Sequence, residues 1–154
     1  MNLKELRKEL NEIVQEYKSH KNAFPFKFCN DAALKLYNEF GLLWVKGGYV
    51  GHFDRKFIEK VRDPNLHSRE YGFDHEFSYN PKLKLFIDIT ANQFDKLLPE
   101  ILIMKVTDQR IALNWNKRNY HTTHYVADVY DIKKHGSNPL EILENGELRL
   151  IKKF

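Results

Sequence analysis

Apolar residues recur at three- and four-residue intervals at the start of the chain, with lysine and glutamate between them. This spacing places the apolar side chains on one face of an α-helix, which predicts an amphipathic helix over residues 2–18. The apolar face consists of Leu3, Leu6, Leu10, Ile13, Val14 and Tyr17. We expect this face to pack on the protein's own core; a helix that binds a partner is the alternative interpretation.

A second helix is predicted over residues 29–40. Gly41 follows it, and glycine is a common left-handed residue at the end of a helix. Pro25 in the preceding connector disfavours helical geometry before it, and Asn30 or Asp31 is the expected cap. The buried face of this helix is expected to be Ala33, Leu36, Tyr37 and Phe40.

Shorter apolar runs predict strands in the rest of the chain. The first covers residues 42–50 and carries a break at its Gly-Gly pair. A polar stretch over residues 51–71 follows, and we expect it to contain a short helix over 55–62 and to flank a substrate cleft. Further strands are expected over residues 101–106, 110–115, 121–129 and 147–152.

Residues 72–94 are the centre of the predicted fold, a β-hairpin followed by a short helix. An Asn-Pro turn separates two strands that carry His75 and Asp88. A loop with an even number of residues puts both side chains on one face. With the loop at 80–83 they are directly opposed, about 4.5–5.5 Å apart at Cβ, whereas a two-residue loop makes them diagonal neighbours about 7–8 Å apart. An odd loop would place them on opposite faces.

Composition limits the class of protein. The 154 residues suit one domain over 1–154, and 42% hydrophobic with 30% charged residues is typical of a globular chain. The formal charge of +4 favours an acidic partner without requiring one. A single cysteine excludes an intrachain disulfide and a thiolate metal cage. With neither a signal-peptide core nor a long apolar run, we expect a cytoplasmic protein without a membrane span; delivery as an effector stays open.

The most informative chemistry is the combination of Cys29, His75 and Asp88. Cys29 stands at the start of the second helix, where free N–H groups and the helix dipole stabilise an anion and make a thiol a better nucleophile. A histidine oriented by a carboxylate is the general base that such a nucleophile needs. Each residue alone has a plainer explanation: a buried inert cysteine, a surface histidine, a helix-capping aspartate.

The order of these residues along the chain resembles the papain-like superfamily and, within it, the transglutaminase-like branch. The resemblance covers roughly residues 24–94 and is carried by FKFCNDAALKLYNEFG, GGYVG, DHEFSYN and LFIDITANQF. It implies an α+β fold with N-terminal helices packed on an antiparallel β-sheet. It also implies that Cys29 is the nucleophile, His75 the base and Asp88 the orienting acid, with no metal or organic cofactor.

The resemblance implies an oxyanion-stabilising glutamine six residues before the cysteine, where this chain has Ala23. The neighbouring Asn22 and the backbone N–H groups near Cys29 are the replacements considered. Gln93 is a second candidate for oxyanion stabilisation or support. Its alternative role is in a capping box with Thr90 at the start of the short helix.

The expected activity is a cysteine-dependent hydrolase or acyltransferase that attacks an amide-type bond and forms a thioacyl intermediate. Transfer to water would make it a peptidase, an amidase or a protein-glutamine deamidase, and transfer to an amine a transglutaminase. We expect a protein or peptide substrate, and an effector or toxin role is one setting for such a small enzyme. The alternative is a non-catalytic protein-binding module that keeps this fold. The oligomeric state is open.

Other readings are weaker. His75 and Glu76 begin a zincin motif, but Tyr79 stands where its second histidine should be. His121 and His124 suit two metal ligands only on a helix, and their surroundings look extended. The mixture of basic and aromatic residues over 115–120 is too small a signal for nucleic acid, so we expect neither a metal nor a nucleic-acid partner.

Overall fold

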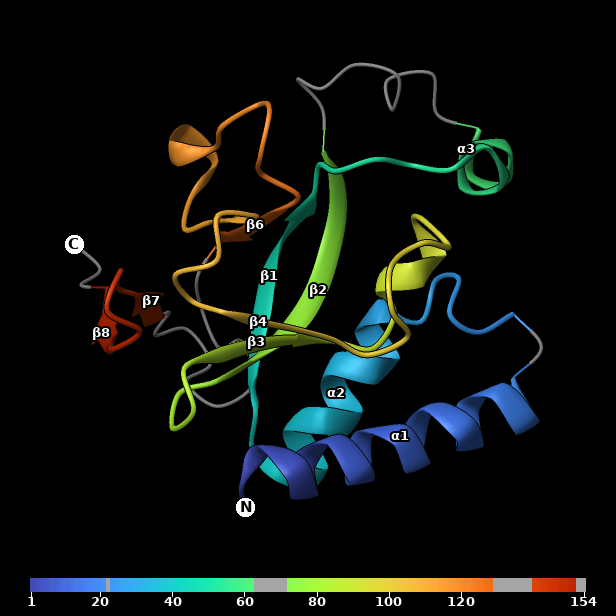
Figure 1. Ribbon diagram of the computed structural model, residues 1–154, viewed down its shortest axis with the longest axis horizontal. Helices are drawn as coiled ribbons and strands as arrows, with labels where there is room; N and C mark the ends of the chain where they lie inside the picture. The colour runs from blue at the N-terminus through green and yellow to red at the C-terminus, as the bar shows by residue number, and fades with distance from the viewer. Residues whose placement is uncertain (22, 63–71, 129–139, 152–154) are drawn as a thin grey trace.

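The computed structural model describes residues 1–21, 23–62, 72–128 and 140–151. It is an α+β structure in which two N-terminal helices cover one side of a six-stranded sheet (Figure 1). The helices are α1 (Leu3–His20), α2 (Cys29–Phe40) and α3 (Arg55–Val61). The strands are β1 (Leu43–Tyr49), β2 (Phe73–Asn80), β3 (Leu85–Asp88), β4 (Leu102–Lys105), β5 (Ile111–Ala112), β6 (Tyr125–Asp128), β7 (Leu140–Ile142) and β8 (Leu148–Leu150).

The sheet has the strand order β4-β3-β2-β1-β6-β5. All neighbours are antiparallel except β5 and β6, which are parallel. Strands β7 and β8 form a separate antiparallel hairpin. The sequence did not predict β7. The strand expected over 110–115 is shorter, with two residues in β5, and Asn114 already caps the short 3-10 helix Trp115–Lys117.

Both N-terminal helices form where the pattern predicted them. α1 begins after Asn2, whose side chain accepts the N–H of Glu5, and buries four of its apolar residues. α2 ends at Gly41, which has a left-handed φ of 65°. The two helices share one apolar cluster with β3. Its buried members are Leu6, Leu10, Ile13, Val14, Ala32, Leu36, Leu42, Ile87 and Ile89.

The opposite face of the sheet carries an aromatic core. Side chains alternate across a strand, so Phe86 of β3 faces this core whereas its neighbour Ile87 faces the helices. Tyr49 of β1 stacks on Phe94, with ring centroids 4.3 Å apart, and α3 adds Phe57. Rings that are rigid and closely packed surround the His75 side chain on this face.

The β2–β3 hairpin has a four-residue loop, but this loop lies one residue later than in the directly opposed arrangement, which shifts the pairing of β2 with β3 by two residues. Asn80 pairs with Leu85 and Ser78 with Ile87, so the loop is 81–84 rather than 80–83. The Asn80 carboxamide oxygen accepts two N–H groups of the loop, which retains this residue in the strand. Continuing the register sets Asp88 two positions from the residue opposite His75. The two are therefore diagonal neighbours on one face.

Two further local predictions were wrong. Gly47 and Gly48 do not break β1, which pairs with β2 and β6 through both residues. The Thr90–Gln93 capping box does not form: residues Ala91–Gln93 are a single 3-10 turn, and the Thr90 side chain makes no capping hydrogen bond. Of the polar stretch after β1, the short helix is present as α3, and residues 63–71 lie outside the described residues.

Candidate active site

Cys29 is the first residue of α2 and is half-buried. The expected caps are wrong: Phe28 is at the N-cap position and no side chain caps the helix. Asn30 instead donates from Nδ2 to Glu76 Oε2 at 2.9 Å, which ties the first turn of α2 to β2. The helix therefore presents the thiol beside β2, and this contact fixes its distance from the strand.

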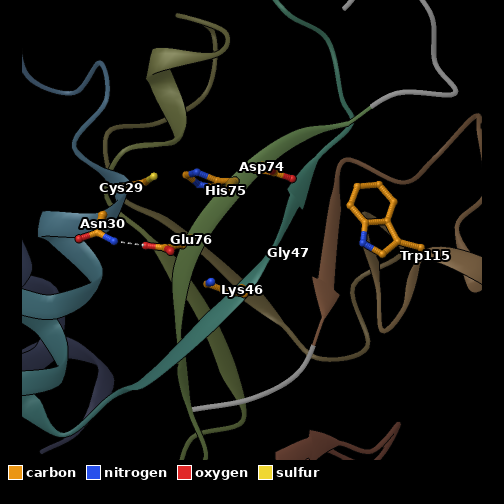
Figure 2. A pocket seen from close by; sticks show the side chains of 8 residues that line it. All are labelled: Cys29, Asn30, Lys46, Gly47, Asp74, His75, Glu76 and Trp115. Carbon is orange, nitrogen blue, oxygen red and sulfur yellow. Dashed lines mark hydrogen bonds between the residues drawn. The ribbon is translucent and has the colours of Figure 1, made fainter. Parts of the chain in front are cut away.

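His75 lies on β2, and β3 ends at Asp88 before it can pair with this part of β2. The edge of β2 at His75 is therefore open to the N-terminus of α2. Cys29 and His75 line the same pocket, and the cysteine sulfur points toward the imidazole (Figure 2).

His75 and Asp88 form a buried pair. The imidazole Nε2 donates to Asp88 Oδ2 at 2.6 Å, and both side chains are at most 2% exposed. The Phe94 ring meets the imidazole edge to face at 4.7 Å, and Phe77 stacks at 5.8 Å, so the ring is held in one orientation. The diagonal register brings the pair together as the hairpin pattern predicted, although not by direct opposition.

Asp88 accepts four hydrogen bonds. Besides His75, the Thr90 N–H and hydroxyl donate to Oδ1 at 2.8 and 3.0 Å, and the Tyr125 hydroxyl donates to Oδ2 at 2.7 Å. Burial alone would raise the pKa of Asp88, but the charge and hydrogen bond of His75, with the bonds from Thr90 and Tyr125, lower it below its ordinary value. The carboxylate is thus ionised and rigidly held. The sequence did not indicate these roles of Thr90 and Tyr125.

Burial lowers the pKa of His75, but the Asp88 charge and hydrogen bond, with a further contribution from Cys29, raise it to about 9 overall. The second ring nitrogen, Nδ1, is buried, and no residue of the described part of the chain forms a hydrogen bond with it. An unsatisfied buried nitrogen is costly in a protein interior. Because Nε2 is occupied by Asp88, Nδ1 is the nitrogen that remains for the Cys29 thiol.

The pocket beside Cys29 and His75 has a volume of about 400 Å³. It is lined by Cys29, Asn30, Lys46, Gly47, Asp74, His75, Glu76 and Trp115. Figure 2 shows Cys29 and Trp115 on opposite sides of it, with the strands β1 and β2 between them. The sequence analysis assigned no site role to Trp115 or to the three charged residues of the lining.

The two oxyanion candidates have different outcomes. Asn22 lies outside the described residues. Gln93 is next to the segment that leads into Cys29, where its Oε1 accepts the N–H of Lys27 at 3.2 Å. Its Nε2 is buried without a hydrogen-bond partner among the described residues, and the described lining of the pocket does not include Gln93. The contact with Lys27 makes Gln93 a support of the connector before Cys29.

Within the described part of the chain, no three histidine, cysteine, aspartate or glutamate side chains come together as metal ligands. None of its helices combines the length and apolar character needed to cross a bilayer. Comparison with protein-family models, curated proteins and solved structures found no match to this chain. Function is therefore inferred from the residues of the site themselves.

Proposed function

We propose that this protein is a cysteine-dependent hydrolase or acyltransferase of papain-like, transglutaminase-like type that acts on an amide-type bond. The observation that carries the proposal is the buried His75 imidazole, which Asp88 holds by Nε2 and whose Nδ1 is unpaired beside Cys29. A structural histidine in a core would have both nitrogens satisfied. Here one nitrogen is satisfied and the other is kept for a group that exchanges a proton.

In the proposed reaction the Cys29 Sγ–H bond breaks, its proton goes to His75 Nδ1, and the sulfur attacks the carbonyl carbon. Asp88 stabilises the imidazolium that forms and keeps the ring orientation. The imidazolium then returns its proton to the leaving amine as the carbon–nitrogen bond breaks, which gives a thioacyl enzyme. Attack by water, or by an amine, on this thioester releases the acyl group and regenerates the thiol.

The pocket supports a peptide or protein substrate, because it is open and its lining offers polar and aromatic contacts from α2, β1, β2 and the turn at Trp115. The amide bond to be cleaved would enter between Cys29 and His75. The alternative, a non-catalytic binding module, would use the same pocket without the proton exchange.

The test is the rate of iodoacetamide labelling of Cys29 between pH 5 and 10, in the parent protein and in His75→Gln and Asp88→Asn, with Cys29→Ser as the blank. We expect fast labelling at neutral pH in the parent. Both variants should slow it at least about tenfold, since a tenfold change corresponds to about 1.4 kcal/mol of lost thiolate stabilisation. If neither substitution changes the labelling rate of Cys29, the proposal is overturned and the binding module is the better function.

A further inference from the structure

We infer that the pocket beside Cys29 binds a cationic group of the substrate, an ammonium or a guanidinium. Its lining has Trp115 on the side opposite Cys29 and two carboxylates of β2, Asp74 and Glu76, of which Glu76 lies beside Asn30 at the start of α2 (Figure 2). This inference rests on the proposed function, because it names the substrate chemistry of the same site. It reduces the range of amide substrates to those with a positive charge near the bond that reacts.

Trp115 is fixed in its position by the backbone. Its turn is capped by Asn114, whose Oδ1 accepts the N–H groups of Asn116 and Lys117 at 2.8 and 3.1 Å. Its ring lies so close to Gly48 and Gly72 that a Cβ at either position would be 2.6 Å from Cη2. A recess that admits the indole exists only because both residues are glycine. The ring is therefore a rigid part of the pocket wall.

The charges of the lining also favour a cation. Asp74 and Glu76 are two residues apart on β2 and project to the same face, whereas Lys46, opposite Glu76 on β1, is the cation of the described lining besides His75. Cys29 and His75, the pair that exchanges the proton, are left out of this balance. Two carboxylates against one ammonium leave the lining with a net charge of −1.

The Trp115 ring already interacts with a cation of the chain itself. The Arg118 guanidinium lies 5.5 Å from its centroid and 4.7 Å from that of Tyr120. The negative face of an indole is the strongest aromatic partner for such a group. An aromatic ring beside carboxylates is an environment suited to an ammonium or guanidinium and unsuited to an anionic substrate.

The decisive test uses three methanethiosulfonate reagents that form a disulfide with Cys29 and release methanesulfinate: a trimethylammonium, a sulfonate and a neutral methyl reagent. We expect the cationic reagent to react faster than the anionic one. Trp115→Ala and Asp74→Asn should each reduce this ratio about two- to fivefold, the size of an exposed cation–π contact. Glu144→Gln, an exposed carboxylate outside this pocket, should leave it unchanged.

The neutral reagent separates this inference from the proposed function. Its rate should depend on His75, and loss of this dependence contradicts the proposed function. An unchanged ratio of the cationic to the anionic rate in Trp115→Ala and Asp74→Asn overturns only the cationic site. Gly48→Ala is the second variant, since its methyl group displaces the indole and should reproduce Trp115→Ala.

Two further measurements identify which part of the reaction supplies the cation. If it belongs to the acyl substrate, Nα-acetyl-arginine amide should slow labelling by the neutral reagent in the parent but not in Trp115→Ala. If it belongs to the acceptor, 1,5-diaminopentane should speed the loss of the acetyl group from Cys29 acetylated with p-nitrophenyl acetate, with N-acetyl-1,5-diaminopentane as the product, again only with Trp115 present. Failure of both overturns the inference as fully as an unchanged charge ratio.

Discussion

Tyr125 and His75 donate to the same carboxylate oxygen, Asp88 Oδ2, at 2.7 and 2.6 Å. The tyrosine comes from β6, two strands away from β2 in the sheet, so the orientation of the Asp88 carboxylate depends on β2, β3 and β6. The Tyr125 hydroxyl is buried with Asp88. Burial, which is the larger effect, and the charge of Asp88 both raise the pKa of Tyr125 well above its ordinary value. Tyr125 therefore keeps its proton and remains a donor to Asp88 at neutral pH.

Tyr125→Phe should lower the free energy of unfolding by about 1–2 kcal/mol, because it removes a hydrogen bond to a buried charge and keeps the ring packing. It should also slow iodoacetamide labelling of Cys29, since Asp88 then stabilises the His75 imidazolium in a less fixed geometry. Urea denaturation and labelling rates measure the two effects. Tyr49→Phe is the matched control: its hydroxyl bonds the His52 carbonyl and not Asp88, so it should affect stability alone.

The His75–Asp88 pair should make stability fall as the pH rises above neutrality. The pKa of His75 is raised from 6.5 to about 9, so the folded state holds a proton that the unfolded chain loses. The stabilisation is complete below pH 6.5 and is lost as the pH rises through about 9, by up to about 1.4 kcal/mol for each pH unit. Asp88, with a lowered pKa, contributes stability above about pH 4 that is lost in acid.

Urea unfolding at a series of pH values measures this dependence. His75→Gln should remove the decline between pH 6.5 and 9, because the titrating group is gone. If the parent and the variant decline in parallel over this range, His75 is not the group that titrates. Such a result would also remove the electrostatic support for a thiolate–imidazolium pair.

The sequence predicted those features that depend on local chemistry. Gly41 marks the end of α2, and the apolar spacing marks α1, because helix periodicity and a left-handed glycine act within a few residues. The hairpin parity that puts His75 and Asp88 on one face is local as well. The predicted loop was one residue too early, and the strand pairing therefore two residues off, because Asn80 bonds the loop from within the strand, an effect of one side chain.

The rest of the site is assembled by sheet topology. Tyr125 is 37 residues from Asp88 and reaches it because β6 pairs with β1, which no local pattern indicates. Trp115 reaches the pocket because β6 pairs with β1 at Gly48, and the turn that carries Trp115 packs beside β6. A glycine pair in a strand usually indicates a bulge. At Gly48 the missing side chain instead makes room for the ring of Trp115, which is distant in the sequence.

Thr90→Val tests which role the threonine plays. A capping residue would affect only the short turn after it, but here the hydroxyl donates to Asp88 Oδ1 at 3.0 Å and the residue is fully buried. Valine keeps the volume and removes the donor, so we expect a loss of about 1–2 kcal/mol in the free energy of unfolding. The labelling of Cys29 should slow as well. Thr122→Val, at a partly exposed threonine, is the control.

Gly48→Ala should be destabilising, because the added methyl group would stand 2.6 Å from Trp115 Cη2 and 2.8 Å from Cζ2, closer than packed atoms approach. Overpacking of this kind costs about 1–3 kcal/mol unless the indole moves away. If the indole moves away, the fluorescence of Trp115 should shift toward that of a solvated indole. Trp115→Phe is the reference, because it leaves only the spectrum of the buried Trp44. An unchanged spectrum together with unchanged stability would mean that the indole does not lie on Gly48. The rigid wall from which a cationic substrate group was inferred would then be lost.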